Sequence, residues 1–525
     1  MNAALISLCA AVFQAQLVPD ALLRDMLDEI SAATALEDTR VLSSRPRYPN
    51  SAAFFEAADY VAGRARDYGL KNVRIERFDG NPMWDAIEGE LDLLEPEPRR
   101  LTSFRETPLA VAQRSAEGDV SGEVVDAGTG TRLSDYENLD LGGKIVLARD
   151  APGAAVWTEA AKRGATGLIT CPSPTFFGRR TPLDSVAWTR APEPAIAMTI
   201  SPNQCAALAR LMRDGRKIRM RLRVKVKRSE PGAIGQLMGE IPGTIVGQDV
   251  VIVAHLDHPA PSANDNASGS AAILEALRVL QRLVAAGKIS APRRTIRFWW
   301  STEISSEQEY FRKHPDDAKA ILLAVNLDQA GGDRNAENNL IAIYGPQWLP
   351  SWADDLVYNL AEHVRQRYAP AEKEPSPLLV APNGSKQSMR TVYWDYAPLS
   401  DHMAFESKEV GIPAISLAVP SLHVIHSSMD TPDRIDTTWL KRSTLMVLAS
   451  AVFTANADRK ETEALLDYVF QRAMVRVAEA ADKRKQLEIE EKRLDSVRSL
   501  DSGVATDPYK KKLRAIVEAL GLSAP

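Results

Sequence analysis

Residues 249–269 read DVVIVAHLDHPAPSANDNASG, an apolar run that leads directly into polar side chains. A short, continuous apolar run is typical of a buried strand. We expect this strand to end at His255, so that the following loop presents Asp257, His258 and Asp265. A helix should then run over Ser268–Ala286, because its isoleucine and leucines recur at helical spacing.

Three later runs repeat this pattern, and helix-patterned segments separate them. They read RTIRFWWST (294–302), ILLAVNLD (321–328) and IPAISLAV (412–419). Alternation of buried strands with helices is typical of α/β proteins. The predicted fold is therefore a mixed, largely parallel twisted sheet flanked by helices. Trp299 and Trp300 lie within the second run and are expected to pack in the core.

Each of these strands leads to a side chain that can bind a metal or carry a proton. His255 ends the first, Glu303 follows the second, Asp328 ends the third, and His426 lies in the loop after the fourth. Ligands of open α/β sheets bind beyond the carboxyl ends of the strands, so these side chains should converge there. Asp265 precedes a helix whose N-terminal amides can stabilise its carboxylate. Mixed imidazole and carboxylate donors suit zinc.

The composition excludes several other classes of protein. The 525 residues carry a net charge of −5, with 45% hydrophobic and 25% charged residues, as in an ordinary globular protein. There is no basic footprint for nucleic acid, and no apolar run reaches the ~18 residues of a membrane span. Three cysteines do not make a thiolate zinc cluster. The serines lack a nucleophile elbow, which argues against serine hydrolysis.

The amino-terminal segment MNAALISLCAAVFQAQ is similar to a secretory signal with cleavage after Ala15. This predicts a secreted or periplasmic protein, in which Cys171 and Cys205 could pair. No Lys or Arg precedes the apolar run, so the alternative is the start of an ordinary helix in a cytoplasmic protein.

Changes in pattern divide the chain into five segments. The last segment, the tail at 459–525, has an amphipathic stripe and then a highly charged stretch. We expect it to form a solvated helix packed on the main domain. The alternative is a short coiled-coil arm that joins a homo-oligomer. The segments are a signal at 1–16, the first part of the main domain at 17–117, an inserted unit at 118–222, the rest of the main domain at 223–458 and a helical tail at 459–525.

The order of the motifs resembles that of the family 28 metallopeptidases, the di-zinc aminopeptidases and their relatives. The motifs are HLD…SANDNASG, WWSTE, VNLDQAG, SDHMAF and HSSMDTPDRID. The resemblance covers residues 20–455 and implies the zinc-exopeptidase fold. The inserted unit, with GGKIVLARD and AAKRGATGLI, resembles the protease-associated domain that many of these enzymes carry.

The resemblance also implies roles for the candidate site residues. His255 and Asp328 would be terminal metal ligands, and Asp265 would bridge two zinc ions. His426, in the last of the motifs along the chain, would also be a ligand. Asp257 would orient His255, as metal-bound histidines require. Glu303 would be the general base that takes a proton from the metal-activated water. Asp401 and His402 match a family motif near the site and would support it.

One position departs from the family pattern, which has two adjacent glutamates, the first a base and the second a ligand. Here Glu303 is followed by Ile304, which cannot bind a metal. One ion alone could bind tightly, or Glu303 itself could be a ligand. His258 is either an additional ligand or substrate contact, or a loop side chain that Pro259 turns into solvent. The residues that could replace the missing ligand are His258, Glu307 and Glu309.

These observations favour a zinc-dependent exopeptidase with a peptide substrate, most simply an aminopeptidase. One alternative is a relative with another amide substrate, such as a carboxypeptidase or a cyclase. A second is a binding protein that keeps the fold and has lost catalysis, which Ile304 favours. Five retained site residues argue against that loss.

Overall fold

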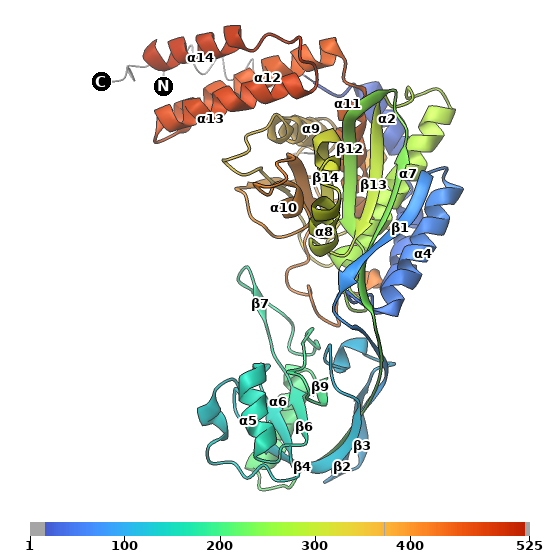
Figure 1. Cartoon of the computed structure of the whole chain (residues 1–525), viewed down its shortest axis with the longest axis vertical. Helices are drawn as coiled ribbons and strands as arrows, with labels where there is room; N and C mark the ends of the chain where they lie inside the picture. The colour runs from blue at the N-terminus through green and yellow to red at the C-terminus, as the bar shows by residue number, and fades with distance from the viewer. Residues whose placement is uncertain (1–15, 372, 520–525) are drawn as a thin grey trace.

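The apolar run that ends at His255 forms β12 (Ile245–His255), inside an eight-stranded sheet (Figure 1). The strand order is β1-β11-β13-β12-β14-β17-β15-β16, and the four pairs β12–β13, β12–β14, β14–β17 and β15–β16 are parallel. The predicted mixed, largely parallel sheet is thus confirmed. The other strands are β1 (Lys71–Gly80), β11 (Gly232–Ile241), β13 (Arg294–Ser301), β14 (Ile321–Asp328), β15 (Leu340–Ile343), β16 (Thr391–Trp394) and β17 (Ala414–Ala418).

The computed structural model describes residues 16–371 and 373–519. The expected signal segment, Gln16 apart, lies outside the described residues. No helix among the described residues is long and apolar enough to cross a membrane.

Helices bury both faces of this sheet, and that explains why β12 is apolar without alternation. Val250 and Ile252 face one core, whereas Val251 and Val253 face a second. The helices of the first core are α2 (Asp20–Glu29), α3 (Ala32–Ser43), α4 (Ala52–Asp67), α7 (Gly269–Ala285), α9 (Ala353–Tyr368) and α11 (Thr437–Asn456). Those of the second are α8 (Ser305–Lys313) and α10 (His402–Phe405).

Two details of the sequence prediction agree with this packing. The helix expected over Ser268–Ala286 is α7, which differs by one residue at each end. Trp299 and Trp300 are both buried and point into opposite cores. Serine side chains accept hydrogen bonds from the first turns of α3, α4 and a third helix, α6 (Pro202–Arg213), which satisfies free backbone amides there; they are Ser31, Ser51 and Ser201.

A second, seven-stranded sheet forms the lower lobe in Figure 1. It includes residues on both sides of the segment 118–222, because Met83–Glu95 pairs with Arg219–Ser229 along nearly its whole length. Its strands, in sheet order, are β3 (Arg99–Ser103), β2 (Met83–Glu95), β10 (Arg219–Ser229), β4 (Gly118–Asp126), β5 (Ile145–Ala148), β6 (Gly167–Thr170) and β9 (Ala197–Thr199). Its helices are α5 (Ala154–Lys162) and α6 (Pro202–Arg213).

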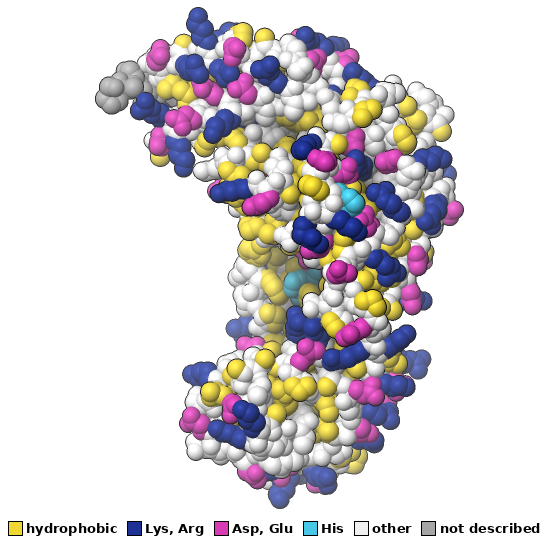
Figure 2. Space-filling view, viewed as in Figure 1, with side chains coloured by type: hydrophobic (Ala, Val, Ile, Leu, Met, Phe, Trp, Pro, Cys, Tyr) yellow, Lys and Arg dark blue, Asp and Glu magenta, His cyan; other side chains and the backbone are white. Residues whose placement is uncertain are grey.

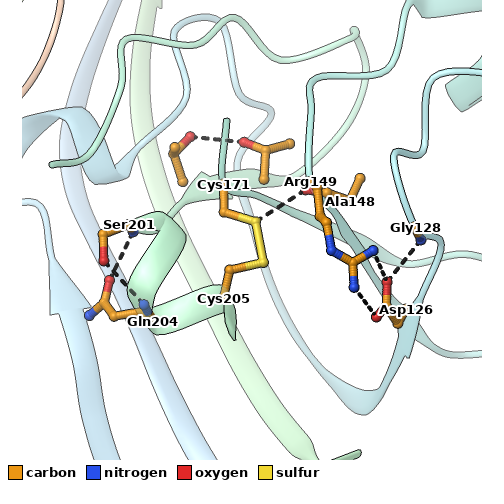
Figure 3. The surroundings of a disulfide bond; sticks show 10 residues. Asp126, Gly128, Ala148, Arg149, Cys171, Ser201, Gln204 and Cys205 are labelled. Carbon is orange, nitrogen blue, oxygen red and sulfur yellow. Dashed lines mark hydrogen bonds and ion pairs between the residues drawn. A yellow bond between two sulfur atoms is a disulfide. The ribbon is translucent and has the colours of Figure 1, made fainter. Parts of the chain in front are cut away.

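A disulfide ties this lobe together (Figure 3). It joins Cys171, directly after β6, to Cys205 on α6, so the pairing suggested for these two cysteines is present. A small hairpin, β7 (Thr175–Phe176) with β8 (Arg179–Arg180), follows Cys171 and extends toward the main body (Figure 1).

The tail forms three helices that cover the upper end of the main body (Figure 1). Asp355 on α9 accepts hydrogen bonds from Arg476 at 2.5 and 3.0 Å, and Arg476 also pairs with Glu490. Apolar side chains of the tail join the first core, which agrees with the expected packing on the body. The helices are α12 (Arg459–Glu479), α13 (Lys483–Ser496) and α14 (Asp507–Ala519).

Short helical segments lie between the longer elements. They are η2 (Pro108–Ala110), η3 (Leu133–Tyr136), η4 (Ala263–Ser268), η5 (Asp317–Ala320), η6 (Pro377–Leu379), η7 (Pro432–Arg434) and η8 (Val497–Ser499).

Candidate metal centre

The carboxyl ends of β12, β13 and β14 bring three of the expected site residues together. His255 ends β12, Asp328 ends β14, and Glu303 lies two residues beyond β13. His255 Nε2 lies 3.5 Å from Asp328 Oδ1 and 4.0 Å from Glu303 Oε1. Asp265, in η4, places Oδ1 at 3.5 Å from the same nitrogen. His255, Glu303 and Asp328 are close enough together to bind one ion, and so are His255, His258 and Asp265.

The second oxygen of Asp265 faces a different pair of side chains. Asp265 Oδ2 lies 3.0 Å from His426 Nε2 and 3.5 Å from His258 Nε2. The two imidazole nitrogens are 3.3 Å apart. Asp265 therefore stands between two groups of donors, which is the position that a bridging carboxylate would occupy.

His258 is buried, with 3% of its surface exposed, so the interpretation of a loop histidine turned into solvent is wrong. The reason is Arg47, whose backbone exchanges two hydrogen bonds with that of His258. The buried guanidinium of Arg47 also donates to the carbonyls of Leu256 and Ser262. Arg47 is distant in sequence and belongs to no motif, so the sequence offered no signal for this contact.

The rings of His255 and His258 are both oriented by Asp257. Their Nδ1 atoms lie 3.3 and 2.9 Å from the backbone carbonyl of Asp257, and its carboxylate lies 3.7 Å from His255 Nδ1. A proton on each Nδ1 leaves the Nε2 lone pair free toward the donor groups. Among the described residues, His255 Nε2 and Asp328 Oδ1 are buried without a hydrogen-bond partner. Buried polar atoms without partners are costly, and a bound cation would satisfy both.

The electrostatics also favour a cation. Burial opposes the protonation of His255, yet the carboxylates of Glu303, Asp257 and Asp328 raise its pKa well above the usual value. Burial raises the pKa of Glu303 well above its usual range, and Asp328 and Asp401 add to this effect. The carboxylates around His255 thus outnumber its single positive charge, and a bound cation would offset their remaining negative charge.

Backbone amides near the site are held by further carboxylates. Asp257 Oδ1 accepts from the amide of Glu303 at 2.8 Å, and Asp401 Oδ1 accepts from that of Ile304 at 3.0 Å. Asp430 accepts from the amides of Asn264 and Asp265 at 2.8 and 3.1 Å. Asp430 lies in the quoted HSSMD motif, but sequence reasoning gave it no role.

The remaining candidates do not join either donor group. Glu307 is buried beside Asp401, and its pKa is raised mainly by burial. Glu309 pairs with Arg312 in a largely exposed ion pair. His402 Nε2 contacts the carbonyl of Ala397 at 2.9 Å.

A cavity of about 420 Å³ opens over the donors, and Figure 2 shows hydrophobic side chains around a histidine in this hollow. The lower lobe supplies part of its wall. Trp188 packs edge-on against His258 and His426, with ring centroids 5.0 and 5.2 Å apart, and Phe176 packs 5.3 Å from His426. Sequence reasoning missed these aromatic residues because their approach depends on how the two sheets are placed. Within the described part of the chain, no Lys or Arg lines the cavity.

Comparison with known sequences finds similarity to peptidases. Residues 236–451 match the sequence model of Peptidase family M28. The chain is 31% identical over 114 residues to leucine aminopeptidase 1 of Ajellomyces capsulatus, over 19% of this chain and 29% of that protein. It is 25% identical over 317 residues to an aminopeptidase of Pseudomonas aeruginosa, over 56% of each. The chain thus spans about half, or less, of the length of these curated relatives.

Solved structures share the fold. BSAP, a zinc aminopeptidase from Bacillus subtilis, aligns with a TM-score of 0.54 and 19% identity, over 80% of this chain and 94% of that one. A peptidase M28 precursor from Shewanella amazonensis aligns with a TM-score of 0.57 and 18% identity, over 83% and 96%.

Proposed function

Because residues 236–451 belong to peptidase family M28, we propose that this chain is a zinc-dependent exopeptidase that removes residues from the amino terminus of peptides. The observation that carries the proposal is the convergence of histidine and carboxylate donors at the floor of a cavity. No Lys or Arg of the described chain lines that cavity. The names of the relatives, aminopeptidases and a zinc aminopeptidase, support the same reaction class.

The donor set fits zinc, which binds imidazole and carboxylate ligands. His255, Asp265 and Asp328 would hold one ion, and His426 would bind on the other side of Asp265. When bound, zinc lowers the pKa of water and polarises a peptide carbonyl. The carbonyl of Asp257 orients His255 so that its Nε2 faces the carboxylates with which it would share the ion.

Glu303 is suited to the role of general base. Asp257 fixes its backbone amide, and its carboxylate faces the cavity and the donor group. Glu303 takes a proton from the attacking water at a carboxylate oxygen and delivers it to the nitrogen of the leaving amine. A raised pKa brings a carboxylate closer to the range in which both transfers are efficient near neutral pH.

The charge of the cavity favours aminopeptidase over carboxypeptidase activity. The titratable side chains that line the cavity are carboxylates and histidines, an environment that suits a free ammonium group better than a carboxylate. A carboxypeptidase needs a cationic group for the terminal carboxylate, and no Lys or Arg of the described chain lines this space. The apolar walls suit an uncharged side chain at the cleaved residue.

Incubation of the zinc-loaded protein with a peptide, its N-acetylated form and its C-terminal amide tests this assignment by mass spectrometry. We expect cleavage of the free peptide and of the amide, one residue at a time from the amino terminus, and no cleavage of the acetylated peptide. Loss of carboxyl-terminal residues would contradict it. Ile304 favours the alternative of a binding protein that has lost catalysis. Such a protein would bind these peptides and cleave none of them.

A further inference from the structure

The second donor group lacks a ligand from the end of β13. Asp265 Oδ2 and His426 Nε2 lie 3.0 Å apart and face the cavity, but Ile304 contributes only an apolar side chain there. Two donors alone make a weak site, because zinc sites in proteins typically have at least three protein ligands.

His258 brings a third donor to this place. Its Nε2 lies 3.5 Å from Asp265 Oδ2 and 3.3 Å from His426 Nε2, and the rings of His258 and His426 are stacked with centroids 5.2 Å apart. Its Nδ1 contacts the carbonyl of Asp257 at 2.9 Å, a contact that requires a proton on Nδ1 and leaves Nε2 with a lone pair.

Neighbouring groups fix the position of His258, as a metal ligand requires. Two backbone hydrogen bonds with Arg47, of 2.7 and 2.8 Å, hold His258 in place. The buried Arg47 side chain then ties the loop to Leu256 and Ser262. Trp188 covers the outer side of the ring. The imidazole is therefore oriented before any ion binds.

We infer that His258 takes the place of the missing carboxylate, so that Asp265, His258 and His426 form a second cation site beside that of His255, Asp265 and Asp328. This inference rests on the proposed function for the identity of the metal. Two imidazoles and one carboxylate favour zinc or cobalt over magnesium or calcium, which prefer all-oxygen sites. Asp265 would bridge the two ions through its two oxygens.

The alternative role of His258 is purely structural. Its Nε2 and that of His426 are close enough for a direct hydrogen bond, which would stabilise the loop without any metal. A count of bound ions separates the two roles, because a structural hydrogen bond binds no zinc.

The experiment uses the full chain, stripped with a chelator, reloaded with zinc and freed of excess metal by gel filtration. Elemental analysis should find two zinc ions per chain in the unmodified protein and one in His258→Ala. Titration calorimetry should show that His258→Ala weakens the binding of the second zinc ion by more than about 100-fold. Loss of a residue that only hydrogen-bonds to a ligand already costs about 10–100-fold in metal affinity. His426→Ala, which removes another ligand of the same ion, should also bind one.

His314→Ala is the matched control, because His314 pairs with Glu76 away from the site; it should keep two ions. Circular dichroism and thermal unfolding of the stripped proteins show whether each variant is folded. A folded His258→Ala protein with two ions would overturn the inference, as would an unmodified protein that binds one ion. In the latter case zinc-dependent cleavage of peptides would leave the proposed function intact. Two ions without any hydrolysis would instead contradict the proposed function alone.

Discussion

Replacement of Glu303 by glutamine should abolish most of the peptide hydrolysis and leave the metal in place. Glutamine keeps the size and shape of the side chain but cannot accept a proton. Glu303 Oε1 lies 4.0 Å from His255 Nε2, whereas Asp265 and Asp328 lie at 3.5 Å. We therefore expect Glu303 to act beside the ion rather than as its ligand.

A positioned general base contributes typically 10²–10⁴-fold to the rate. That range corresponds to about 2.7–5.4 kcal/mol of activation free energy, at 1.36 kcal/mol for each factor of ten. The whole loss should fall on kcat, with KM nearly unchanged, because proton transfer occurs in the transition state. No carboxylate is adjacent in sequence to replace it, since Ile304 follows.

The assay measures kcat and KM on a leucyl arylamide together with zinc content by elemental analysis. Glu309→Gln is the matched control, because Glu309 pairs with Arg312 outside the site and its loss should leave both quantities unchanged. Activity of Glu303→Gln near that of the unmodified protein would refute the role of base. Loss of one zinc ion would show instead that Glu303 is a ligand.

Three further predictions concern stability. Replacing Cys171 and Cys205 together by serine should destabilise the lower lobe by about 4 kcal/mol, from the loop entropy of a 34-residue separation, as measured by urea unfolding; an unchanged midpoint would contradict it. Asp355→Ala removes one of the two carboxylates that pair with Arg476, the other being Glu490, and should cost about 1–3 kcal/mol, with limited proteolysis of the tail as the readout; an intact tail would refute this. Burial and Asp354 raise the pKa of Glu406 to about 9. The folded state thus binds this proton more tightly than the unfolded state, and stability should fall as pH rises from about 4.5 to 9. Glu406→Gln should remove that part of the slope, and an unchanged slope in urea titrations at pH 5 and 8 would count against it.

The sequence predicted the main sheet because its signals are local. The uninterrupted apolar run of β12 reflects burial on both faces, and the residues at the strand ends follow directly from strand direction. His255, Asp265, Glu303, Asp328 and His426 therefore come together as expected.

The missed features all depend on contacts between distant segments. The orientation of His258 is set by Arg47, and the amide of Asp265 is held by Asp430, but neither contact leaves a periodic pattern in the sequence. The pairing of β2 with β10 could not be predicted, because it forms only after the chain returns from the inserted unit. The wall formed by Trp188 depends on how the two sheets lie relative to each other.

The most direct test of the proposed activity is a zinc titration of the stripped protein, monitored by hydrolysis of leucyl arylamide and of its N-acetyl derivative. Hydrolysis of the free-amine substrate should be absent without metal and rise in proportion to zinc bound, while the acetylated substrate stays uncleaved. Full activity in the stripped protein, or equal cleavage of both substrates, would contradict a zinc-dependent aminopeptidase.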